Sequence, residues 1–93
     1  MSSMEPEEFQ KLLDEHYKWP TEYMFKFIAK TDLLDEIKKL EAIFDELELI
    51  EKSTRSSHGG KYTSFSVRAQ MSSSAAVVEV YEKVYAIGGI VSL

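Results

Sequence analysis

The chain contains no cysteine, and it has only two prolines and four glycines in 93 residues. Without thiols it has no disulfide framework, no thiolate nucleophile and no sulfur ligand for zinc, which agrees with a reducing compartment. It also lacks a run of about 20 apolar residues, which a membrane-spanning helix needs. Its first residues have neither the basic start nor the apolar run of a secretion signal. We therefore expect a cytoplasmic protein without a membrane partner.

Basic residues are scarce in the first half of the chain. Residues 1–51 carry 14 acids and 6 Lys/Arg, a net charge of -8, whereas residues 52–93 carry 2 acids and 5 Lys/Arg, a net charge of +3. Most of the acids lie where the pattern indicates solvent-exposed helix faces, and there they favour solubility. The acidic balance disfavours a nucleic-acid partner, because nucleic-acid binding depends on phosphate neutralisation by cations.

The length of the chain allows one folded domain with a single core. Ahead of it, residues 5–16 show the helical spacing of Phe9, Leu12 and Leu13 among charged residues. This helix should end before Trp19-Pro20, because the residue before a proline is displaced from helical angles. We expect residues 1–20 to form an N-terminal helical appendage and residues 21–93 to form the domain.

The domain begins with a strand and a helix. Residues 23–30 alternate with period two, and we assign the row that contains Tyr23 and Phe25 to the core. Asp32 is expected to cap the following helix, with Asp35 at its third position. The apolar stripe of this helix recurs at spacings of four and three. It consists of Leu33, Ile37, Leu40, Phe44 and Leu47.

A hairpin follows, in which the polar residues 48–57 turn at Gly59-Gly60 onto residues 61–71. A two-residue glycine turn requires positive φ at both positions, which costs glycine little. Residues whose numbers sum to 119 should then face each other. This register places Glu51 opposite Arg68, and Ile50 opposite Ala69 on the core side. The predicted buried row of the second strand is Thr63, Phe65, Val67, Ala69 and Met71.

The last part of the chain predicts a second helix and a short strand. Residues 72–74 are serines that can cap a helix over the valine-rich segment, Gly88-Gly89 end it, and residues 90–93 form the strand. The element order predicts an α+β fold, a ferredoxin-like βαββαβ sandwich with an extra N-terminal helix. Its four-stranded antiparallel sheet has the order 4-1-3-2 with two helices on one face. The polar strand of residues 48–57 then lies at an edge.

Several segments carry a family resemblance: Trp19-Pro20-Thr21 leading into the strand with Lys26, the hairpin sequence of residues 56–67, and Val80-Tyr81-Glu82. From about Trp19 to Leu93 the chain resembles the YbeD-like family of small bacterial proteins of unknown function. It differs by one extra glycine in the hairpin loop and by the acidic helix before Trp19. The resemblance implies a ferredoxin-like fold, a likeness to ACT regulatory domains and a proposed link to lipoate metabolism.

No group of residues predicts catalysis or metal binding. His16 and His58 are far apart in the sequence and lack the ligand spacing of a metal site. The serines have no base that the sequence places beside them, and neighbouring carboxylates lie on solvated helix faces. We therefore expect no enzyme activity, no catalytic residue, no metal and no cofactor.

Two other binding functions stay open as alternatives. An RNA-recognition module has the same topology and stacks bases on aromatic residues of its open sheet face, but Tyr62 and Phe65 point to opposite faces. An ACT-type sensor of small ligands needs a glycine in the turn between the first strand and helix, where residues 29–32 have none. The sensor ranks second and RNA binding third.

The open face of the predicted sheet is the best candidate for a functional surface. Met24, Lys26 and Ile28 lie there beside polar residues of the neighbouring central strand, a composition that suits contact with another protein. We predict a non-enzymatic regulatory or adaptor domain that binds an unknown protein partner through this face or an edge strand, with a homodimer as one form. The predicted binding residues are Lys26, Tyr62, Ser64, Ser66 and Arg68.

Overall fold

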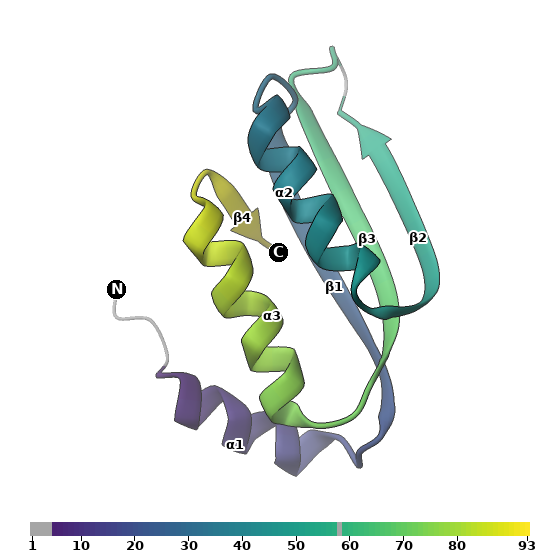
Figure 1. The fold of residues 1–93 in the computed structure, drawn as a ribbon, viewed down its shortest axis with the longest axis vertical. Coiled ribbons are helices and arrows are strands. Elements are labelled where there is room, and N and C mark those ends of the chain that lie inside the picture. Colours follow the sequence, from purple (N-terminus) through teal and green to yellow (C-terminus); the bar gives the residue numbers. More distant parts are fainter. Residues whose placement is uncertain (1–4, 58) are drawn as a thin grey trace.

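The computed structural model describes residues 5–57 and 59–93 as an α+β arrangement of three helices and one antiparallel sheet. The strand order β2-β3-β1-β4 is the predicted order 4-1-3-2 in reverse. Helices α2 and α3 cover one face of the sheet, and α1 lies across its lower end beside α3 (Figure 1). The elements are α1 (Pro6–His16), β1 (Thr21–Lys30), α2 (Leu34–Asp45), β2 (Glu48–Ser56), β3 (Tyr62–Met71), α3 (Ser74–Ile87) and β4 (Ile90–Ser92).

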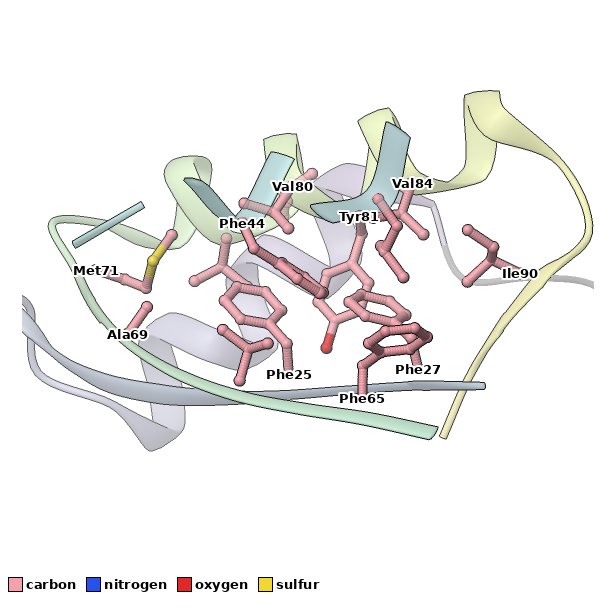
Figure 2. Packing of buried hydrophobic residues seen from close by; sticks show 14 of the residues in the cluster. Phe25, Phe27, Phe44, Phe65, Ala69, Met71, Val80, Tyr81, Val84 and Ile90 are labelled. Carbon is pink, nitrogen blue, oxygen red and sulfur yellow. The ribbon is translucent and has the colours of Figure 1, made fainter. Parts of the chain in front are cut away.

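Aromatic rings from β1, β3 and α2 fill the core between the helices and the sheet. The ring of Phe27 stacks on Phe25 at a centroid distance of 6.2 Å and on Phe44 at 6.0 Å. Phe65 lies opposite Phe27 across the central strand pair. These four side chains are fully buried, and they lie with Tyr81 between the strands and α3 (Figure 2). The predicted core rows of β1 and β3 are thus confirmed.

The start of α2 differs from the prediction. Its N-cap residue is Leu33, without a side-chain cap bond, so the prediction that Asp32 caps the helix is wrong. The reason is a backbone turn before the helix, in which Leu34 N–H donates to the carbonyl of Asp32 at 2.9 Å. The start of α3 follows the prediction, because Ser73 Oγ accepts a bond from Ala76 N–H at 3.1 Å.

The hairpin register is confirmed from Glu51 to Ser56, where paired residue numbers sum to 119. A β-bulge between Leu49 and Glu51 then shifts the pairing, so that Leu49 rather than Ile50 faces Ala69. The placement of Ile50 on the core side is therefore wrong, because a bulge inserts one residue without a partner, and 45% of its surface is exposed.

The turn of the hairpin has positive φ at both glycines, 87° at Gly59 and 72° at Gly60, as predicted. Gly60 N–H donates to the carbonyl of Ser57 at 2.8 Å. Ser57 is therefore the first residue of the turn, one residue before the expected position. The expectation for His58 lies outside the described residues.

Helix α1 packs against α3. The Phe9 ring lies edge-on to Tyr81 at a centroid distance of 5.3 Å, and Leu13 is part of the buried core. The division of the chain into an appendage over residues 1–20 and a domain over residues 21–93 stays a prediction. Within the described residues, no helix has the length and apolar character needed to cross a membrane.

Candidate functional site

The open face of the sheet brings the predicted binding residues together. Across the central strand pair, Lys26 lies opposite Ser66 and Ile28 lies opposite Ser64. At the two ends of this row, Lys30 faces Tyr62 and Met24 faces Arg68. Successive side chains of a strand alternate between faces, and the intervening residues are the buried core row. The five predicted residues therefore share the face that α2 and α3 leave uncovered (Figure 1).

Arg68 is engaged by carboxylates of both neighbouring strands. Its Nε lies 3.5 Å from Glu22 Oε1 on β1, and its Nη2 lies 3.5 Å from Glu51 Oε1 on β2. The buried Nε makes an ion pair at this distance but no hydrogen bond within the described part of the chain. The guanidinium thus links three strands, and its charge is offset within the fold. The predicted pairing of Glu51 with Arg68 is confirmed.

Next to Arg68, hydroxyl groups surround a shallow hollow of about 220 Å³. Ser53 and Arg55 of β2 join the predicted Ser64 and Ser66 of β3 as its lining. Ser64 Oγ donates to the carbonyl of Arg55 at 3.3 Å. The two β2 residues are absent from the predicted site, although the register sum of 119 already places them beside Ser66 and Ser64.

A second hollow, which the sequence did not indicate, lies where α1, α3, β1 and the end of β4 meet. This groove has a volume of about 700 Å³ and is mostly aromatic and apolar. It joins residues from the first and last elements of the chain, so local patterns contain no signal for it. We call it the aromatic groove. Its lining residues are Pro6, Phe9, Tyr23, Val78, Tyr81, Glu82, Tyr85, Ser92 and Leu93.

Two tyrosine hydroxyl groups meet in the aromatic groove, with Tyr23 Oη and Tyr81 Oη 3.1 Å apart. Burial is the main cause that raises the pKa of Tyr81 far above its ordinary value, and the bond to Tyr23 raises it further. Burial also raises the pKa of Tyr23. Both phenols are therefore neutral at physiological pH, and they offer hydrogen bonds rather than a phenolate charge.

Metal-binding residues do not gather in the described ranges. No group of three or more His, Asp or Glu side chains is placed there so that it could hold an ion. His16 lies at the last turn of α1, and the second histidine, His58, lies outside the described residues. The chemistry of the two hollows is thus that of hydroxyls, aromatic rings and single charges.

A family model described as a protein of unknown function, DUF493, matches residues 14–92 of the chain. The chain belongs to the DUF493 family. The matched range begins near the end of α1 and contains all four strands and both covering helices. No curated protein and no solved structure matches the chain. The YbeD-like resemblance and the likeness to ACT domains stay predictions.

Proposed function

We propose that this DUF493 domain is a non-enzymatic regulatory or adaptor module that binds a protein partner through its open sheet face. The observation that supports it is the uncovered face of the central strand pair, where 42% of Met24 and 37% of Tyr62 are exposed. Exposed apolar side chains between cations and hydroxyls are typical of protein interfaces. The ferredoxin-like classification, the cytoplasmic location and a homodimeric form belong to the same proposal.

The charge of the open face supports a partner with an acidic surface. The face carries four cations against three carboxylates, a net charge of +1, whereas the whole chain has a net charge of -5. Opposite potentials across an interface favour encounter and orient the partners. The cations are Lys26, Lys30, Arg55 and Arg68, and the carboxylates are Glu22, Glu48 and Glu51.

The test is retention of partners by the full chain purified from its native cell. The variant Lys26→Ala/Tyr62→Ala truncates two open-face residues without touching the core. Lys39→Ala is the matched control, because Lys39 is an exposed lysine on α2, away from the open face. A central anchor pair should contribute about 2 kcal/mol or more to binding, so partners should be lost from the first variant and kept by the second. Unchanged occupancy in quantitative mass spectrometry would contradict the proposal.

The volume of the aromatic groove supports a second candidate, an ACT-type sensor of a small ligand linked to lipoate metabolism. Its 700 Å³ falls in the range of about 300 to 1,000 Å³ that small-molecule sites occupy. A thermal-shift screen against amino acids and lipoate-type metabolites tests this candidate. RNA binding ranks third, because β1 and β3 present a single aromatic side chain, Tyr62, on the open face, and base stacking uses several. Salt-dependent RNA retention tests this candidate.

A further inference from the structure

The two edges of the sheet are covered very differently. Strand β4 pairs with β1 only over Phe27–Ala29, and Leu93 N–H adds one bond to the carbonyl of Lys26 at 2.9 Å. The first half of β1, which begins at Thr21, has no strand beside it on the β4 side within the described part of the chain. The last three-residue strand is therefore too short to cover the strand it pairs with.

The main-chain groups exposed at this edge are identified by the strand alternation. Thr31 N–H donates to the carbonyl of Lys61, which continues the bonds to β3 through the odd-numbered residues of β1. The even-numbered residues direct their N–H and C=O groups toward β4, as Lys26 does. Beyond the end of β4, these groups of Glu22 and Met24 have no backbone partner within residues 5–57 and 59–93, and both residues are exposed.

The aromatic groove lies directly beside this exposed edge. Tyr23, between the two edge residues, belongs to the row that faces the helices and lines the groove. Ser92 and Leu93 line it at the end of β4, and Phe9 of α1 lines it as well. In Figure 1, β4 lies beside the upper part of β1 and α1 lies near its lower end, and α3 runs alongside. A further strand placed against Met24 therefore continues the line of β4 and adjoins the groove.

We propose that the β1 edge and the aromatic groove together bind an extended segment of a partner protein by strand addition. The residue paired with Met24 points to the open face, and its two neighbours point toward the helices, as Tyr23 and Phe25 do. An apolar residue at each of these two positions fits the aromatic lining. Glu82 is the charged member of the groove lining, so a basic residue at a further groove-facing position of the segment complements it.

The opposite edge of the sheet is a less suitable docking site. Strand β2 is exposed over its whole length, but from Glu51 onward its side chains are polar, and a bulge interrupts its pairing at Ile50. Lys52 on this strand is engaged by Glu41 of α2 at 3.8 Å. Lysines and bulges are the devices by which natural sheets protect their edges from pairing. The β1 edge has an apolar groove where β2 has these protecting features.

This inference rests on the proposed function in one respect, that the partner is a protein. The experiment uses a displayed library of random peptides, about eight residues long, selected against the full chain. Selected peptides should show two apolar residues at alternate positions and an Arg or Lys at a further position of the same alternation. In the complex, the amide protons of Glu22 and Met24 should gain protection from hydrogen exchange. Small molecules that displace the peptides would identify the groove as a shared site without altering this outcome.

Met24→Pro is the sharpest variant, because it removes the outward N–H without removing a bond to β3. It should weaken peptide binding about tenfold, the effect of losing a main-chain hydrogen bond and its neighbours. Met24→Ala is the matched control, since it truncates the side chain on the open face and keeps the N–H. Two exposed groove residues provide variants that spare β1: Tyr85→Ala should weaken binding, and Glu82→Lys should remove the preference for a basic residue.

Three results would overturn the proposal. They are the absence of enriched peptides, equal binding by Met24→Pro and Met24→Ala, and protection of amides elsewhere while Glu22 and Met24 exchange freely. If the Pro variant does not fold, the Glu82→Lys and Tyr85→Ala variants and the exchange pattern decide. The open-face variant Lys26→Ala/Tyr62→Ala leaves the groove lining unchanged. Its loss of native partners with intact peptide binding, or the reverse, separates the failure of one proposal from that of the other.

Discussion

The two faces of the central strand pair have the same backbone and different surroundings. On the covered face, Phe25, Phe27 and Phe65 are at most 1% exposed and pack in contact with the helices. On the open face, Met24 is 42% exposed, and ion pairs of Arg68 replace the ring contacts. Neighbouring residues of one strand thus belong to two environments.

This difference between the two faces indicates which contacts supply the free energy of folding. Burying one large apolar side chain contributes about 1.5 to 3 kcal/mol, whereas an exposed ion pair contributes about 0 to 1 kcal/mol. The covered face should therefore hold the domain together, and the open face should contribute little to its stability. The following substitutions test this contrast, beginning with the largest expected effect.

Phe44→Ala should lower the free energy of unfolding by about 3 to 5 kcal/mol, because it leaves a cavity against Phe27 and Phe65. Phe44 is fully buried, and its ring lies 6.0 Å from Phe27 and 6.4 Å from Phe65. Urea unfolding measures the change. Met24→Ala on the open face is the control and should leave the midpoint nearly unchanged. Similar midpoints for the two variants would refute the contrast between the faces.

Valine at Gly59 or Gly60 should destabilise the hairpin by about 1 to 3 kcal/mol, because a β-branched residue with positive φ is strained. A Cβ atom at either position would meet nothing within 4 Å, so the cost comes from the backbone alone. Asparagine, which tolerates this region, is the control and should cost less. Thermal unfolding compares the variants. Backbone chemical shifts that indicate negative φ at both glycines would contradict the turn.

Tyr81→Phe should cost about 1 kcal/mol through loss of its hydroxyl bond to Tyr23. It should also change the dependence of stability on pH. Because burial raises the pKa of both phenols above 10, the unfolded chain releases their protons first as the pH rises. Stability is therefore retained below pH 10 and falls above it, by up to about 1.4 kcal/mol per pH unit for each phenol.

Stability curves between about pH 8 and 11 measure this dependence on pH. The range brackets the ordinary tyrosine pKa of about 10. The exposed Tyr62, 37% accessible and on the opposite face of the sheet, provides Tyr62→Phe as the matched control. The decline above pH 10 should be shallower in Tyr81→Phe than in the control. Equal slopes in the two variants would show that the Tyr81 hydroxyl titrates alike in the folded and unfolded chains.

Lys26→Ala/Arg68→Ala should change the free energy of unfolding least, by about 1 kcal/mol or less, although it removes both ion pairs of Arg68. Denaturant unfolding measures the change, and Glu7→Ala on α1 is the control for removing an exposed charge. A loss above about 2 kcal/mol would mean that the link between the three strands stabilises the fold as a buried contact does. The open face would then be structural.

Period-two and helical spacing determine the strands and helices, because these patterns depend on neighbours along the chain. They were sufficient to predict the strand order, the buried rows and the hairpin register from Glu51 to Ser56, and with them the location on one face of Lys26, Tyr62, Ser64, Ser66 and Arg68. The bulge at Ile50 and the late start of α2 could not be predicted. Both depend on how the turns at the ends of α2 join the sheet.

The aromatic groove and the exposed β1 edge were decided only by the tertiary structure. The groove brings together Pro6 and Leu93, residues near opposite ends of the chain, and it exists because α1 docks on α3 through Phe9. The exposed edge exists because β4 is shorter than the β1 strand that it pairs with. Neither the docking of a helix nor the mismatch of two strands leaves a periodic pattern in the sequence, because each depends on contacts between distant segments.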